Sequence, residues 1–174
     1  AGNLYVSGGG ADNNLVNHFL IRKSSDNGIT WTTVDDVSGH TARGIVADGN
    51  TLYSYGDDQY YSEPYPDIPT VERSHGIVRK STDAGATWVT IDTYSLDGGR
   101  FSASGAAIDP VTGDIYLAGG GLDFDGYTHA VVRKGANGVF SNVHNYLVWG
   151  ATLTGQITRL KSIAVSPSGT VYLA

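Results

Sequence analysis

The residues best able to do chemistry lie at positions 56–74, where tyrosines alternate with carboxylates. Tyrosine rings stack on the apolar faces of sugars, and carboxylates accept hydrogen bonds from hydroxyl groups. The segment therefore predicts a carbohydrate-binding surface, and a solvated or internally packed insertion is the alternative. The candidate ligand-binding residues of this segment are Asp57, Asp58, Tyr60, Tyr61, Glu63 and Tyr65.

A second polar stretch, at positions 119–128, adds Asp123, Asp125 and Tyr127 to the candidates. Asp123 and Asp125 alternate as calcium ligands do, but the EF-hand pattern is absent. We therefore predict no cofactor and keep bound calcium as an alternative. Trp149 is a further candidate, either as a platform for a ligand or, as we favour, as a ring packed against its neighbours.

Three histidines recur, each four residues before an arginine. The pairs are His18 with Arg22, His75 with Arg79, and His129 with Arg133. Repeated histidines could ligate a metal, but each belongs to a different copy of a repeat, so we predict hydrogen-bonding roles and no metal site. The repeated arginine indicates an internal ion pair, with Asp35 and Asp92 as candidate partners. No catalytic residue is predicted, because G-x-S-x-G, P-loop and H-E-x-x-H motifs are all absent.

An internal repeat supplies the elements that position these residues. The octet S-x-D-x-G-x-T-W stands at residues 24–31 and again at residues 81–88, both times after an apolar segment ending in Arg-Lys. Apolar segments on both sides of a glycine-containing turn predict a β-hairpin. The octet itself is therefore expected to be a turn.

A third copy of the hairpin lacks the octet and carries the short turn Asn137-Gly138. From the Lys of Arg-Lys to the next aromatic residue the chain is two residues shorter than in the other copies. A change of two residues keeps side-chain parity. Phe140 is therefore predicted to face the same way as Trp31 and Trp88.

Two more strand types recur between the hairpins. One is rich in small residues (43–47, 104–108, 161–165) and the next carries a tyrosine (4–6, 52–54, 115–117, 171–173). With the two hairpin strands they form a unit of four antiparallel strands. Strand A is the strand of small residues, strand B carries the tyrosine, strand C ends in Arg-Lys, and strand D follows the hairpin turn. Such a unit of about 50 residues is typical of a propeller blade. The predicted fold class is all-β, a β-propeller of four-stranded antiparallel blades with about three blades in this chain.

The whole chain, residues 1–174, is predicted to be one domain. The blades are expected at about residues 1–38, 39–96 and 97–150, with strands A and B of a further blade at about 158–174. Single-chain propellers usually have four to eight blades. We therefore expect a piece of a longer propeller or a ring completed by other copies, which makes a homo-oligomer one expected partner.

The octet resembles the Asp-box, or bacterial neuraminidase repeat, which occurs in sialidases, other glycosidases and exported bacterial repeat proteins. Residues 78–88 are most similar to the exported repeat proteins rather than to catalytic sialidases. The resemblance implies that the box is the turn between strands C and D of a blade, with its Asp bound to the turn and its Trp packed between blades. The residues with these implied structural roles are Ser24, Asp26, Gly28, Trp31, Ser81, Asp83, Gly85 and Trp88.

Composition excludes several classes. The formal net charge of -6 argues against nucleic-acid binding. The chain has no Cys, which excludes disulfides and thiol nucleophiles. No apolar run is long enough for a membrane span. Glycine makes up 24 of the 174 residues, and together with few charges this suggests short strands and tight turns.

The function we expect is a non-catalytic binding or adhesion module that is extracellular or at the cell surface, with the periplasm as an alternative. It would recognise cell-surface glycans or proteins through the B–C and D–A loops, which share one face of the repeat. One alternative is a self-assembling fibre or scaffold segment. The other is part of a glycoside hydrolase, which needs two carboxylates across a cleft. A sialidase is disfavoured because the F/Y-R-I-P segment is absent.

Overall fold

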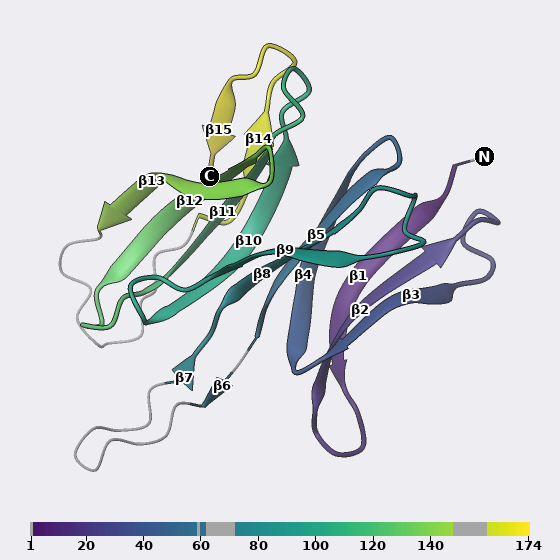
Figure 1. The fold of residues 1–174 in the computed structure, drawn as a ribbon, viewed down its shortest axis with the longest axis horizontal. Coiled ribbons are helices and arrows are strands. Elements are labelled where there is room, and N and C mark those ends of the chain that lie inside the picture. Colours follow the sequence, from purple (N-terminus) through teal and green to yellow (C-terminus); the bar gives the residue numbers. More distant parts are fainter. Residues whose placement is uncertain (1, 59, 62–71, 148–159) are drawn as a thin grey trace.

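The computed structural model describes residues 2–58, 60–61, 72–147 and 160–174, all of them in β-strands or their connections (Figure 1). This confirms the prediction of an all-β chain. Among the described residues, no helix is long and apolar enough to cross a membrane. The strands are β1 (Leu4–Ala11), β2 (Asn17–Ser24), β3 (Thr32–Ser38), β4 (His40–Asp48), β5 (Thr51–Asp58), β6 (Tyr60–Tyr61), β7 (Glu72–Arg73), β8 (Gly76–Ser81), β9 (Val89–Tyr94), β10 (Arg100–Ile108), β11 (Ile115–Leu122), β12 (Thr128–Ala136), β13 (Val139–Leu147), β14 (Ile163–Val165) and β15 (Val171–Leu173).

The strands pair antiparallel, in chain order, into four main sheets. Sheet 1 is β1-β2-β3, sheet 2 is β4-β5-β8-β9, sheet 3 is β10-β11-β12-β13 and sheet 4 is β14-β15. The short β6-β7 ladder lies between β5 and β8 in the chain. Sheets 2 and 3 therefore have the predicted strand order A-B-C-D, and sheet 1 has the order B-C-D.

The sheets pack against one another in sequence order. β4 lies against β1 and β2, β10 lies against β4 and β5, and β14 lies against β10 and β11. We call the contact of sheets 1 and 2 the first junction, and that of sheets 2 and 3 the second junction. Each junction contains a buried apolar cluster, because each sheet has an apolar face to bury.

The first junction buries Phe19, Ile21, Ala42 and Ile77, and Trp88 packs against this group. The second junction has the larger cluster, in which Leu96, Phe101, Ile115, Leu117 and Val131 are each at most 2% exposed.

Every C–D hairpin shifts register at the same place, immediately before the repeated arginine. The shifts fall between Ile21 and Arg22, between Val78 and Arg79, and between Val132 and Arg133. After the shift, Lys23 pairs with Thr32, Lys80 with Val89 and Lys134 with Ser141. Each of these partners directly follows the repeated aromatic residue. The predicted parity of Phe140 is therefore confirmed.

The short third turn also has the predicted geometry. Asn137 and Gly138 have φ values of 51° and 81°, so both are left-handed, as a two-residue type I′ hairpin turn requires. Asn tolerates this conformation better than most residues with a side chain, and Gly adopts it without steric cost.

The B strands run further than the sequence pattern predicted. β5 continues through Asp58 and β11 through Leu122, so the expected loops at 56–74 and 119–128 begin too early. Glycine misled the prediction. Gly56 and Gly119 lie in strands, where an added Cβ would collide with the carbonyl oxygens of Thr41 and Ser102 on the neighbouring strand. Here glycine permits close backbone approach rather than forming a loop.

Candidate functional site

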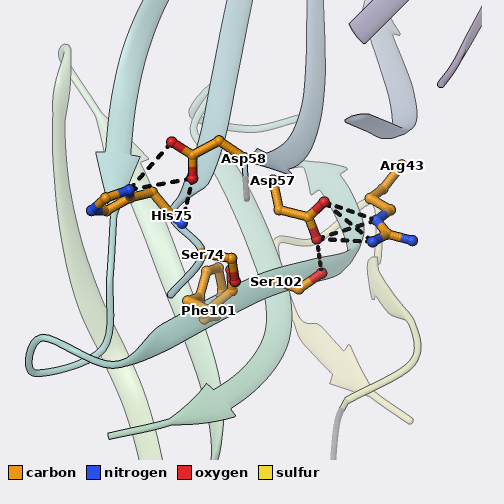
Figure 2. Close-up of polar contacts among 7 residues, drawn as sticks. All are labelled: Arg43, Asp57, Asp58, Ser74, His75, Phe101 and Ser102. Atoms are coloured by element: carbon orange, nitrogen blue, oxygen red, sulfur yellow. Dashed lines mark hydrogen bonds and ion pairs between the residues drawn. The ribbon is translucent and has the colours of Figure 1, made fainter. Parts of the chain in front are cut away.

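Asp57, the first candidate, is buried between sheets 2 and 3 and only 5% exposed (Figure 2). Arg43 of β4 donates to both carboxylate oxygens from Nε and Nη2 at 3.1–3.3 Å. Ser102 Oγ of β10 donates to Oδ2 at 2.6 Å. The carboxylate therefore joins two strands of sheet 2 to sheet 3. These contacts give Asp57 a structural role, and sequence reasoning had missed both Arg43 and Ser102.

The repeated histidines each meet an aspartate at or just after the end of strand B. His75 Nδ1 lies 3.2 Å from Asp58 Oδ1 (Figure 2), and His129 Nε2 lies 3.0 Å from Asp123 Oδ2. His18 Nε2 lies 3.8 Å from the third aspartate, Asp12. A hydrogen bond to Asp36 at 2.6 Å is the main cause that raises the pKa of His18.

Each histidine thus makes hydrogen bonds, as the sequence predicted, and the partners named here belong to its own sheet or to a loop of that sheet. Among the described residues, no group of three or more His, Cys, Asp or Glu side chains is placed to hold a metal ion.

The same aspartates brace the loops that they begin. Asp12 Oδ1 accepts hydrogen bonds from the backbone N–H groups of Asn14 and Val16, and Asp123 Oδ1 accepts one from Tyr127 N at 2.8 Å. Asp58 Oδ1 accepts from His75 N at 2.5 Å. Asp12 was missed from sequence, although it precedes His18 by the same six residues that separate Asp123 from His129.

The β11–β12 loop presents the most accessible candidates. Asp123 N donates to Tyr127 O at 3.0 Å, and Gly126 N donates to Asp123 O at 3.1 Å, so the loop is a closed turn. On this turn Phe124 is 65% exposed and Tyr127 is 50% exposed, and Asp125 is also exposed. The result is a braced turn that carries two aromatic rings and one accessible carboxylate.

The remaining loop candidates are described in part or not at all. Tyr60 and Tyr61 form β6, paired with Arg73 and Glu72 of β7. Their side chains are outside the described atoms. Glu63, Tyr65 and Trp149 lie outside the described residues, and their proposed roles stay predictions.

The octet turns are held by their own side chains. Asp26 Oδ1 accepts hydrogen bonds from Thr30 N at 2.9 Å and from Ser24 Oγ at 2.7 Å, and Oδ2 accepts from Thr30 Oγ1 at 2.5 Å. Asp83 makes the same bonds with Thr87 and Ser81.

These bonds, with the threonine hydroxyl first, lower the pKa of both aspartates to about 2. Gly28 and Gly85 hold the left-handed φ values of 88° and 80° that the turn needs. Trp31 Nε1 donates to Gly28 O at 3.1 Å. The Ser, Asp and Gly positions of both octets thus hold their own turns, whereas Trp31 bonds to its own turn and Trp88 packs against the apolar cluster of the first junction.

The repeated arginines form ion pairs that cross from one sheet to the next. Arg79 Nη2 donates to Asp35 Oδ1 of sheet 1 at 2.8 Å, and Arg133 donates to both oxygens of Asp92 of sheet 2 at 2.9–3.1 Å. Burial raises the pKa of Asp92, and the charge of Arg133 opposes that shift. The predicted partners are therefore correct. Arg22, in the first sheet, is exposed and donates to Trp31 O at 2.8 Å.

Neither the models of known protein families nor the curated proteins contain a match to this chain.

Proposed function

We propose that this chain is part of an Asp-box β-propeller that acts as a non-catalytic, exported binding module at the cell surface. The successive face-packed sheets and the ion pairs that cross both junctions support the propeller architecture. The self-contained hydrogen bonding of the octet turns supports the structural role of the Asp-box. A module of this kind needs no cofactor.

The braced β11–β12 turn carries the binding proposal. Loops that present function are usually held by a rigid scaffold, and the bonds of Asp123 to Tyr127 and His129 provide that support. Exposed aromatic rings are costly in water and are favoured where a partner covers them. Phe124 and Tyr127 are suited to stacking on sugar rings, and Asp125 is suited to accepting hydrogen bonds from sugar hydroxyls.

A glycan-array screen followed by titration tests this function. The chain should bind a subset of cell-surface glycans, and Phe124→Ala and Tyr127→Ala should each weaken binding by roughly tenfold, the loss expected for about 1.4 kcal/mol. Tyr172→Ala is the matched control, because Tyr172 is 60% exposed on β15, away from this turn. Well-folded protein that binds no glycan would overturn the proposal and leave a protein partner to be sought.

Glycoside hydrolysis is disfavoured by the contacts of the candidate carboxylates. Asp57 is buried under Arg43 and Ser102, and Asp123 is bonded to its own loop and to His129. A glycosidase needs one carboxyl group to protonate the leaving oxygen and another to act as base or nucleophile, both facing the substrate.

Self-assembly is the second candidate, and the outer face of sheet 1 favours it. Leu4 and Val6 are 45% and 46% exposed there, and Arg22 is at the position where Arg79 and Arg133 each reach an aspartate of the preceding sheet. A sheet from another copy could cover this face. A concentration-dependent dimer or trimer in analytical ultracentrifugation that Val6→Glu dissociates would support assembly, whereas a monomer at all concentrations would contradict it.

A further inference from the structure

The second junction contains a cavity of about 390 Å³ at the end where the C–D turns lie. Tyr53 and Lys80 of sheet 2 line one side, and Asn137 and Phe140 of sheet 3 line the other. Thr112 and Asp114, in the connection between β10 and β11, complete the polar part of the lining. This volume lies within the range of small-molecule sites in proteins.

The first junction shows what the equivalent tyrosine and lysine bind when a hydrogen-bond acceptor is present. Tyr5 and Lys23 are paired across β1 and β2, as Tyr53 and Lys80 are across β5 and β8. Tyr5 Oη and Lys23 Nζ both donate to the carbonyl oxygen of Ala84, at 2.7 and 2.9 Å. Ala84 lies in the octet turn of sheet 2, so this turn fills the end of the first junction.

The third hairpin leaves the equivalent place at the second junction open. Its turn is two residues shorter than the octet turn, and it brings no acceptor to Lys80 or Tyr53. Lys80 Nζ lies 5.2 Å from the centre of the Tyr53 ring, and among the described residues neither polar group makes a hydrogen bond.

The equivalent lysine of the third hairpin, Lys134, has a different kind of partner. Lys134 Nζ lies 2.8 Å from Asp114 Oδ2. Of the three equivalent lysines, Lys23 therefore has a carbonyl partner and Lys134 has a carboxylate partner, whereas Lys80 faces the cavity with neither among the described residues.

We propose that this cavity is a binding site for a small hydroxylated carboxylic acid of about monosaccharide size, such as a hexuronate. The ligand carboxylate takes the position that the Ala84 carbonyl has at the first junction, and it accepts hydrogen bonds from Lys80 Nζ and Tyr53 Oη. A charged acceptor suits this pair better than a neutral one, because hydrogen bonds between charged groups are about twice as strong. Thr112, Asp114 and Asn137 supply polar lining for hydroxyl groups, and Phe140 supplies an apolar wall.

This site is separate from the proposed glycan-binding turn. It lies at the end of the sheets where the C–D turns are, whereas Phe124 and Tyr127 lie on a B–C loop. Variants of Phe124 and Tyr127 should therefore leave ligand binding in the cavity unchanged, so that each proposal can fail without the other.

Titration of the full chain with D-glucuronate, followed by NMR and calorimetry, tests the site, with D-glucose as the neutral comparison. We expect glucuronate to bind and to shift the resonances of Tyr53 and Asn137, and glucose to bind at least tenfold more weakly. Lys80→Gln should weaken glucuronate binding about tenfold or more, as loss of a charged hydrogen bond implies. Lys23→Gln, the equivalent change at the filled junction, should leave binding unchanged.

A turn graft gives a second, independent test. Replacing residues 135–140 by the sequence of residues 81–88 places an octet turn in the third hairpin, and its carbonyl should fill the cavity and abolish binding. A folded wild-type chain that binds no glucuronate, equal binding by the wild type and Lys80→Gln, or retained binding in the folded graft variant would each overturn the proposal.

Discussion

The two junctions between neighbouring sheets share one strand register but are filled by different side chains. In the first junction, Phe19 of strand C supplies an aromatic ring that is fully buried. The equivalent residue at the second junction is Gly76, where an added Cβ would collide with Phe101. The corresponding aromatic ring at the second junction therefore comes from Phe101, on strand A of the following sheet.

The polar contacts of the two junctions differ in the same way. Asp57 at the second junction bonds to Ser102, whereas the equivalent Gly9 at the first junction lies against the side chain of Thr41. At the opposite end, an octet turn closes the first junction and a short turn leaves the second open. The comparison teaches that the bulge position and the even difference in turn length preserve the strand register, while the length of the turn and the side chains at each junction decide whether that junction is closed or can accept a ligand.

The largest effect that would test this comparison is loss of an ion pair that crosses a junction. Arg133 is 6% exposed, bonded to Asp92 and stacked at 3.8 Å from the centre of the Tyr94 ring. Arg133→Ala leaves Asp92 half-buried without its cation, so we expect the free energy of unfolding to fall by about 3–5 kcal/mol. Urea denaturation measures this.

Arg22→Ala is the matched control, because Arg22 is exposed and has no aspartate of a preceding sheet to pair with among the described residues. Its cost should stay within about 0.5 kcal/mol, as for most surface substitutions. Equal losses for the two variants would contradict the role given to the crossing ion pairs.

A smaller effect is expected from the polar link that distinguishes the second junction. Asp57→Ala removes the acceptor of Arg43 and Ser102, and leaving these donors without it should cost about 2 kcal/mol. Asp125→Ala, at an exposed carboxylate, should cost almost nothing. If Asp57→Ala kept full stability and instead lost glycan binding, Asp57 would be a ligand residue after all.

Sequence reasoning reached the features that depend on spacing along the chain. The register of the hairpins, the orientation of Phe140 and the partners of Arg79 and Arg133 all follow from the repeat. The two junction fillings do not, because Phe19, Gly76 and Phe101 meet only through packing of segments far apart in sequence.

The candidate site was predicted less well, for a physical reason. Carboxylates among tyrosines look solvent-exposed in a sequence. In the structure, however, Asp57 is bonded to Arg43, Asp58 to His75, and Asp123 to His129. Gly56 and Gly119 made strand ends resemble loops. Asp125 and Tyr127 remain accessible, as their loop position suggested.

The two octet turns should make the stability of the fold depend on pH in the acid range, whereas the short third turn should not. The ionised forms of Asp26 and Asp83 are bonded in the folded state, where both have a pKa of about 2, below the ordinary 3.8. Their contribution is therefore complete above pH 4 and is lost as the pH falls through 2. Thermal unfolding of the Asp26→Asn, Asp83→Asn double variant should show a weaker fall in Tm between pH 4 and 2 than the wild type shows. An unchanged slope would contradict this account.

The most direct test compares Lys23→Met with Lys80→Met by urea denaturation without ligand. Both substitutions remove an ammonium group above a tyrosine ring, at 5.7 and 5.2 Å from its centre, so that loss is matched. Within the described part of the chain Lys23 also bonds to a turn carbonyl and Lys80 does not, which should make Lys23→Met less stable than Lys80→Met by about 1 kcal/mol. Lys80→Met should be close to wild type. Equal destabilisation by the two variants would contradict the claim that one junction is closed and the other open.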